Sequence, residues 1–200
     1  MLSYAPVAMI IRRSSIRLTL FAALLGVAPL AGQGAAAQPS PADVAFMSGM
    51  IGHHAQAVLM AGWAETHGAS PTVLNYCRKV AVSQRDEIHL MERWLADHHQ
   101  APADTSGMYA LPGPGMDRMR MPGMLTAEQL VRLDSARGPA WDRLFLEDMI
   151  RHHQGAVSMV NQLFETPGAG QGLVFQFATD VSADQTIEIS RMRQMLLTLP

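Results

Sequence analysis

One segment of this chain occurs twice, and this repetition constrains the fold more than any other feature of the sequence. The first copy runs from Phe46 to Met60 and reads FMSGMIGHHAQAVLM, and the second runs from Phe145 to Met159 and reads FLEDMIRHHQGAVSM. Asp43 and Asp142 extend the match upstream. A paired histidine flanked by methionines can arise once by chance, whereas two copies in the same register indicate a duplicated structural unit.

The correspondence continues downstream after a shift of two residues. Gln84, Glu87 and Met91 of the first unit match Gln185, Glu188 and Met192 of the second. Each unit therefore contains a histidine pair followed by a glutamate.

Start and stop signals predict helices around both copies. Ser40 and Asp43 form a capping box before a helix over about 41–67, and Ser70-Pro71 opens a second helix that ends near 99. Further signals predict a short helix over about 126–136 and long helices over about 139–165 and 173–199. No strand-like alternation competes with this pattern. We therefore expect an all-α fold, a four-helix bundle built from two duplicated helical hairpins.

The first 37 residues are typical of a cleavable export signal. Arg12, Arg13 and Arg17 precede an apolar run over 18–30, and small residues at 35–37 offer a cleavage site near Ala37. The run is too short to span a bilayer comfortably. The pattern leaves general secretion and twin-arginine export both open. The expected mature protein is periplasmic or secreted.

Residues 38–200 are expected to form one domain. Its predicted parts are repeat 1 over about 41–99, a loop rich in methionine, proline and glycine over about 100–124, the short helix over about 126–136, and repeat 2 over about 139–199. Removal of the three arginines of the signal changes the formal net charge from −2 to −5, because the signal contains no acidic residue. This charge excludes a nucleic-acid-binding domain, and no second apolar run predicts a membrane span in the mature form.

Cys77 is the only cysteine, so an intrachain disulfide and a multi-cysteine metal site are both excluded. We interpret it as a small buried residue of a helix. If the protein binds a soft metal, methionine must supply most of the sulfur.

Glu87 and Glu188 fall near the middle of the apolar stripes of their helices. A carboxylate in a helical core must pair, become protonated or bind a metal, because a bare buried charge costs several kcal/mol. The histidine pairs lie at the margins of the apolar stripes of the other two helices. The sequence therefore predicts that histidine and glutamate lie close together.

Two interpretations of this proximity remain open, a metal site and a structural hydrogen-bond network. Adjacent histidines diverge on a helix, so one of each pair is expected to bind metal while the other orients it. Met50 and Met149 lie three or four residues before the histidines, a spacing that suits chelation. Imidazole and thioether together favour copper, especially Cu(I), or silver.

The loop contains a second cluster of thioethers. Met108, Met116, Met119, Met121 and Met124 lie in a stretch without helical period. They either form an apolar flap over the bundle or gather around a soft ion, and the sequence favours neither interpretation.

The remaining charged and histidine residues receive simpler interpretations. His67 and His89 are interpreted as surface residues, and Glu147, Asp148 and Arg151 as a solvated helical face. His98 and His99 end the second helix as terminal cations or additional ligands.

The two copies together resemble the domain-of-unknown-function 305 family. The shared pattern is Asp-x-x-Phe-x-x-x-Met-Ile-x-His-His-x-x-Ala-Val-x-Met followed by Gln-x-x-Glu-Ile-x-x-Met, and the Met-Pro-Gly-Met run at 121–124 is also typical. The resemblance covers most of residues 41–199. It implies a ferritin-like helical bundle in exported bacterial proteins, some of which are tied to copper binding and copper tolerance. It implies no established catalytic activity.

The leading hypothesis is thus an exported copper or silver binding protein, not an enzyme, that sequesters, buffers or delivers the ion without an organic cofactor. Its candidate ligands are His53, His54, Met50, Met60, Glu87, His152, His153, Met149, Met159, Glu188, Met116, Met119, Met121 and Met124. A protein that receives the metal and a homo-oligomer both remain open. The alternatives are a ferritin-like di-iron oxidase, although the chain lacks the usual Glu-x-x-His motif, and a structural or partner-binding bundle without metal.

Overall fold

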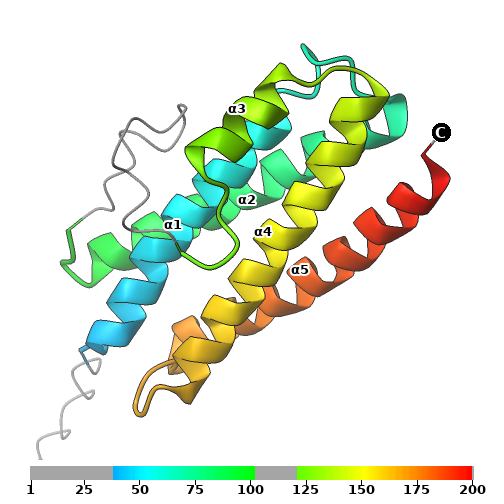
Figure 1. The fold of residues 1–200 in the computed structure, drawn as a ribbon. Helices are drawn as coiled ribbons and strands as arrows, with labels where there is room; N and C mark the ends of the chain where they lie inside the picture. Colours follow the sequence, from blue (N-terminus) through cyan, green and yellow to red (C-terminus); the bar gives the residue numbers. More distant parts are fainter. Residues whose placement is uncertain (1–37, 102–120, 200) are drawn as a thin grey trace, which may run out of the picture. The chain divides into compact units, whose positions relative to one another are not determined.

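The computed structural model describes residues 38–101 and 121–199. These residues form five helices and no strand, which confirms the all-α prediction (Figure 1). The helices are α1 (Pro41–Gly62), α2 (Pro71–Asp97), α3 (Ala127–Ser135), α4 (Pro139–Glu165) and α5 (Gly172–Thr198). The predicted export signal and the loop residues Met108, Met116 and Met119 lie outside the described residues.

The helix starts follow the signals in the sequence. Ser40 and Asp43 form the capping box of α1, and Thr126 and Gln129 form that of α3. The predicted end of the first helix at 67 was wrong, since α1 ends at Gly62. Residues 63–68 instead form turns that end at Gly68, whose φ of +72° is accessible to glycine at little cost.

The four long helices form two antiparallel hairpins. Helix α1 packs along α2, helix α4 packs along α5, and the hairpins meet chiefly through α1 and α4 (Figure 1). The short helix α3 contacts α4. The duplicated sequence therefore corresponds to a duplicated hairpin, as predicted.

Two duplicated aspartates connect the hairpins to each other. The Asp43 carboxylate at the start of α1 accepts a hydrogen bond from the Gly170 backbone N–H, 2.6 Å away, just before α5. The Asp142 carboxylate near the start of α4 accepts one from the Ser70 N–H, 3.1 Å away, just before α2. Each hairpin thus anchors the start of the second helix of the other.

The apolar core has two parts with a polar layer between them. One cluster includes Phe46, Met47, Met50, Met91, Trp94, Met159 and Phe177. The other includes Met60, Cys77, Trp141, Phe145, Met149 and Met192. On the four long helices, the duplicated histidine, glutamine and glutamate positions fall between most residues of one cluster and those of the other. Among the described residues, no helix is long and apolar enough to cross a membrane.

Candidate metal centre

Four histidines occupy the polar layer, and all of them are fully buried. His53 and His54 lie on α1, and His152 and His153 lie at the equivalent positions of α4. Such complete burial is unusual for a titratable group and requires specific partners or an unusual pKa.

The outer histidine of each pair contacts the glutamate of its own hairpin. His54 Nε2 lies 2.5 Å from Glu87 Oε2, and His153 Nε2 lies 2.7 Å from Glu188 Oε2. The glutamate side chains are 20% and 18% exposed, so each carboxylate joins a buried imidazole to the bundle surface. The proximity of histidine and glutamate predicted from the sequence is confirmed.

The inner histidines face each other between α1 and α4. The ring centroids of His53 and His152 are 3.8 Å apart. Burial, reinforced by the neighbouring His54, lowers the pKa of His53 to about 3. Burial and the nearby His53 and His153 also lower the pKa of His152 well below its ordinary value. Both inner imidazoles are therefore neutral at physiological pH.

The hydrogen-bond partners determine where the proton of three of these rings lies. The Pro122 carbonyl, 2.9 Å from His53 Nε2, can only accept, so that nitrogen donates and Nδ1 of His53 keeps its lone pair. The carboxyl oxygens of Glu87 and Glu188 likewise accept from Nε2 of His54 and His153. The Nδ1 lone pairs of these three histidines are thus available inside the bundle.

These lone pairs have no partner within the described part of the chain. Nδ1 of His53, His54 and His153 and both ring nitrogens of His152 are buried without a hydrogen bond. The amide of the neighbouring Gln84 is also unpaired, as is the Gln185 oxygen. Buried polar atoms are normally satisfied, so a cluster of nitrogens without a protein partner is a candidate site for an ion or a water molecule.

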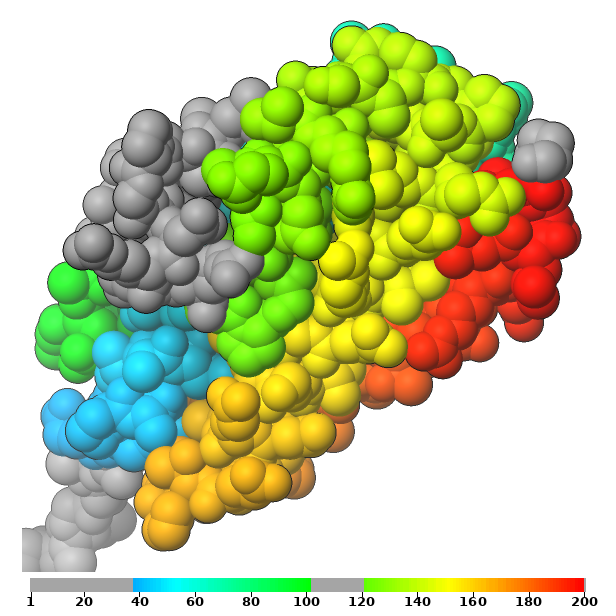
Figure 2. Space-filling view, in the orientation of Figure 1, coloured from blue at the N-terminus to red at the C-terminus, as the bar shows by residue number. Residues whose placement is uncertain are grey.

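The end of the inter-repeat loop covers the inner histidines. We call residues 121–125 the strap. In addition to the Pro122 carbonyl bond to His53, the strap backbone at Leu125 donates to Gln56 Oε1 over 2.8 Å and accepts from Gln56 Nε2 over 3.2 Å. The strap and the residues that follow it lie on the surface of the molecule beside α4 (Figure 2).

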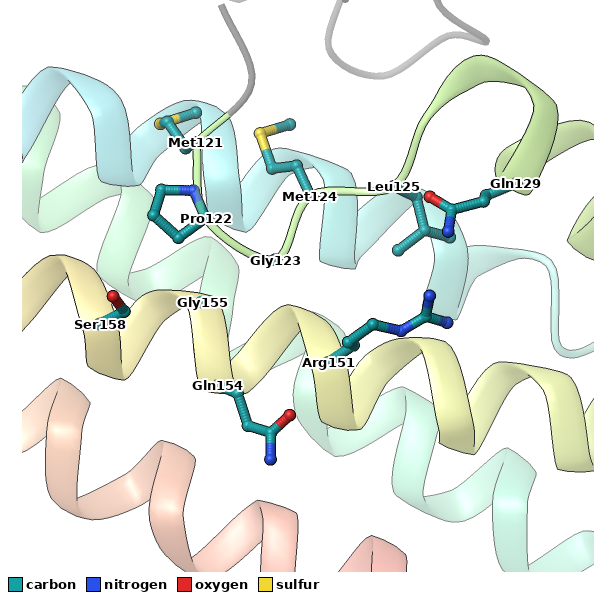
Figure 3. Close-up of a pocket in the computed structure, with 10 residues that line it drawn as sticks. All are labelled: Met121, Pro122, Gly123, Met124, Leu125, Gln129, Arg151, Gln154, Gly155 and Ser158. Atoms are coloured by element: carbon teal, nitrogen blue, oxygen red, sulfur yellow. The ribbon is translucent and has the colours of Figure 1, made fainter.

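Two glycines allow the strap to approach α4 closely. A Cβ atom on Gly155 would lie 1.9 Å from the Pro122 carbonyl oxygen. Gly123 has a φ of +80°, and a Cβ there would lie 2.6 Å from the Arg151 carbonyl oxygen. Figure 3 shows Gly123 as the part of the strap nearest α4, above Gly155, while the Met124 side chain extends away from that helix. Together with α4 and Gln129, the strap lines an open pocket of about 540 Å³.

The structure places the candidate methionine ligands on different sides of the histidine layer. Met121 and Met159 both approach Gly49, since a Cβ at that position would lie 3.1 Å from Met121 Sδ and 3.6 Å from Met159 Cε. Met50 belongs to the same cluster. Met60 and Met149 belong to the cluster on the other side of the histidine layer, and Met124 is half-buried at the pocket. Met116 and Met119 lie outside the described residues.

Oxygen, nitrogen and thiolate ligands alone do not complete a site here. Among the described residues, no three histidine, cysteine, aspartate or glutamate side chains are arranged to hold a metal ion. Burial raises the pKa of the Cys77 thiol, which disfavours the thiolate. A metal ion in the histidine layer would therefore need to have few ligands, to bind a thioether as well, or to bind with a change of side-chain rotamer.

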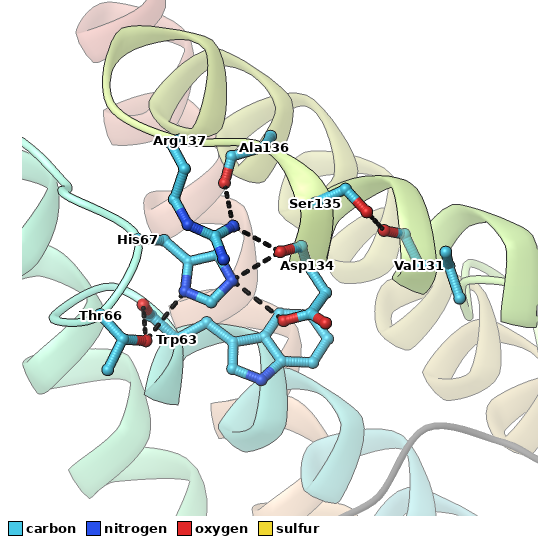
Figure 4. A network of polar contacts seen from close by, with 8 residues as sticks. All are labelled: Trp63, Thr66, His67, Val131, Asp134, Ser135, Ala136 and Arg137. Carbon is cyan, nitrogen blue, oxygen red and sulfur yellow. Dashed lines mark hydrogen bonds and ion pairs between the residues drawn. The ribbon is translucent and has the colours of Figure 1, made fainter.

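Two predictions about neighbouring residues were wrong. His67 is buried, whereas His89 is exposed as predicted. The His67 ring stacks on Trp63, and its nitrogens contact the Thr66 hydroxyl over 2.9 Å and Asp134 Oδ1 over 3.0 Å (Figure 4). This network joins the end of α1 to the end of α3.

Asp148 is fully buried, although the sequence suggested a solvated face. Its carboxylate pairs with Arg151, and Arg132 of α3 lies 3.6 Å away. Burial raises the pKa of Asp148, and the two arginines oppose that shift. The His98 ring lies tilted against that of Trp94, and its Nδ1 contacts the Trp94 carbonyl oxygen over 2.8 Å, which favours a helix-terminal role.

The sequence contained a signal for the strap that its interpretation missed. Gln56 and Gly155 occupy equivalent positions of the two repeats but differ in size and polarity. The structure explains the difference, because Gln56 binds the strap backbone and Gly155 gives it space.

Comparison with known proteins identifies relatives of the whole bundle. The family model described as a domain of unknown function (DUF305) matches residues 43–196. No curated protein matches the chain. A DUF305 fragment from Deinococcus radiodurans is 28% identical over 79% of this chain and 97% of its own, with a TM-score of 0.67. A DUF305 protein from Streptomyces coelicolor is 25% identical over 78% of this chain and 92% of its own, with a TM-score of 0.65.

A third relative has been solved with metal. CopM in its Cu(II)-bound form is 28% identical over 78% of this chain and 95% of its own, with a TM-score of 0.60. CopM structures also exist in Cu(I)-bound and Ag-bound forms, with TM-scores of 0.57 for the Cu(I) form and the soaked silver form. The chain is therefore similar in sequence and fold to a protein that binds copper and silver.

Proposed function

The chain belongs to the DUF305 family, and we propose that it is an exported protein that binds Cu(I) or Ag(I) in the histidine layer of its helical bundle. The inner histidines His53 and His152 are the central ligands in this proposal. His54 and His153 are supporting ligands, and Glu87 and Glu188 orient them. The nearby thioethers of Met121 and Met159 complete the set.

The observation that carries this proposal is the pattern of free ring nitrogens. Histidines that bind metals usually donate their other ring N–H to a carboxylate or a backbone carbonyl, which fixes the tautomer and raises the basicity of the ligand. His54 and His153 have such a carboxylate, and His53 has such a carbonyl. A purely structural network would be expected to use the Nδ1 atoms as well.

The ligand chemistry favours a soft monovalent ion. Neutral imidazole and thioether groups suit Cu(I) and Ag(I), whereas magnesium and calcium prefer oxygen ligands. The lack of a three-ligand group of nitrogen, oxygen and thiolate donors among the described residues fits an ion that accepts few ligands. CopM, with its copper-bound and silver-bound forms, supports the same choice.

We further propose that the protein is not an enzyme and that it sequesters, buffers or delivers the ion outside the cytoplasm. The export-like sequence before Gln38 supports this location, as does a relative named as a secreted protein. Delivery would require a receiving partner.

An anaerobic Cu(I) competition titration against a chromophoric chelator tests the site. The double variant His53→Gln/His152→Gln should lose more than about 100-fold in affinity, because loss of an outer partner alone costs about 10- to 100-fold. His89→Gln is the matched control, since this histidine is exposed. A second variant replaces Met116, Met119, Met121 and Met124 with leucine.

The outcomes separate the candidate sites. Affinity lost in the histidine variant and lowered in the methionine variant is the result expected for the bundle site, because the methionine variant also removes Met121. Affinity lost only in the methionine variant places the ion in the loop. If the wild-type protein does not compete for Cu(I), the structural interpretation replaces the proposal. Iron binding with oxygen-dependent turnover would instead support the di-iron alternative, which no observation on the described residues favours.

A further inference from the structure

We propose that the strap gates the histidine layer, and that Gly155 and Gln56 are the positioning residues that hold the gate closed. This inference rests on the proposed function and adds control of metal exchange to it. It assigns a role to two residues that neither contact the ion nor belong to the duplicated pattern.

The strap lies over the site instead of connecting distant elements. Its Pro122 carbonyl reaches His53, whose ring faces His152. Met121, the first residue of the strap, packs against α1 beside Gly49, near Met159. The strap therefore contacts the inner histidine His53 and brings the Met121 thioether to the same face of α1 as Met159.

Among the described residues, the two repeats contact the strap in different ways. On the α1 side, the Gln56 amide makes two hydrogen bonds to the Leu125 backbone. On the α4 side, Gly155 contributes no side chain, and the strap backbone fills the space where a Cβ would be. One repeat thus supplies the hydrogen bonds, and the other supplies the space.

This arrangement permits a gate, because the attachment is local and breakable. The two hydrogen bonds between Gln56 and Leu125 join neutral groups, and each is weak enough in net terms for thermal fluctuation to break it. Residues 121–124 are half-buried, whereas Leu125 is buried in the apolar core, so release of the strap exposes new apolar surface chiefly at Leu125. Release would break the His53–Pro122 bond and uncover the inner histidines together.

Two variants and a matched control test the gate. Gly155→Ala places a Cβ in the position of the strap carbonyl, while alanine still favours the helix more than glycine does. Gln56→Ala removes both hydrogen bonds to Leu125. Gly62→Ala is the control, since a Cβ on this α1 glycine would contact nothing within 4 Å.

Hydrogen exchange on the metal-free full chain measures whether the strap is docked. The Leu125 amide should lose protection in Gly155→Ala and Gln56→Ala and keep it in Gly62→Ala. This readout is independent of copper. In Gly155→Ala the Gln56 acceptor is intact, so loss of protection there reports undocking of the strap whether or not the proposed function is correct.

Stopped-flow transfer of Cu(I) to an excess of chelator measures the rate at which the protein releases the ion, which the gate should control. Release should be about tenfold faster in both strap variants, a factor that corresponds to the loss of about one hydrogen bond. Equilibrium affinity should fall by less than the tenfold rise in release rate, because an open gate also speeds uptake and so offsets part of the loss of Met121 and of the Pro122 partner of His53. A merely structural role would not produce this separation of rate from affinity.

Three results would overturn the inference. The first is a Leu125 amide that stays protected in both variants. The second is an exposed strap with an unchanged Cu(I) release rate, which would leave the proposed function intact. The third is a wild-type protein that binds no Cu(I), which would reject the proposed function as well and leave the strap as a structural cover.

Discussion

At the scale of single residues, the function of each histidine depends on which ring nitrogen is occupied. Glu87, Glu188 and the Pro122 carbonyl each take an Nε2 hydrogen, and the opposite nitrogens remain unpaired in the core. In the proposed site, a glutamate in this arrangement would affect the metal through the histidine rather than by contact.

Glu87→Gln should therefore weaken Cu(I) binding by about 10- to 100-fold, the usual effect of removing an outer-shell partner. The amide can still accept a hydrogen bond, but it lacks the charge that makes the imidazole a stronger ligand. Chelator competition measures the change. Glu92→Gln on the same helix is the control, because Glu92 is exposed and pairs with the exposed His89. An equal effect of both substitutions would contradict the orienting role of Glu87.

At the scale of helices and their ends, the duplicated aspartates explain how two hairpins form one bundle. Helix α5 has no side-chain cap of its own, and its start is held by Asp43 from the other hairpin. Asp43 also completes the capping box of α1, so one carboxylate serves two helix starts. Negative charge is favourable at both positions because of the helix dipole.

Asp43→Ala should lower the free energy of unfolding by about 2–4 kcal/mol, because it removes a cap and a hydrogen bond to a charged acceptor. Urea denaturation of the metal-free protein measures the loss. Asp180→Ala provides a control with the same chemical change at an exposed position of α5. If both variants unfold at the same urea concentration, Asp43 does not hold the hairpins together.

At the scale of the whole molecule, the bundle contains a polar layer with two buried, uncharged inner histidines between two apolar clusters. Its stability should depend on pH, because the folded pKa values of His53 and His152 lie below the ordinary value of 6.5. Below pH 6.5 the unfolded chain binds protons that the folded protein excludes, so the unfolded state is favoured as the pH falls. This contribution is fully present above pH 6.5 and is lost as the pH falls toward the folded values.

The free energy of unfolding of the metal-free protein should thus fall between pH 6.5 and about 4, by up to about 1.4 kcal/mol per pH unit for each inner histidine. His152→Gln should reduce this slope, and it breaks no hydrogen bond made by the wild-type ring. His89→Gln should leave the slope unchanged. A wild-type slope that persists in His152→Gln would show that other groups cause the acid sensitivity.

The sequence by itself determined the helical architecture and the polar layer. Capping boxes mark the starts of α1 and α3, and the repeat implies two hairpins whose equivalent positions share an environment. The proximity of histidine and glutamate followed from helical spacing and from the cost of an unpaired buried charge, while the choice of His54 as the partner of Glu87 came from the structure. These properties are local or periodic, so a one-dimensional pattern contains them.

Only the tertiary structure decided which side chains meet across the hairpins. The helical period placed His53 at the margin of the apolar stripe of α1. It could not show that His53 faces His152, or that the Pro122 carbonyl in the loop accepts a hydrogen bond from its Nε2. The burial of His67 and Asp148 likewise depends on α3, whose position no helical pattern specifies. The position of the strap also came only from the tertiary structure. The sequence shows a glycine at 155, but not that the backbone of the distant Pro122 fills the space beside it.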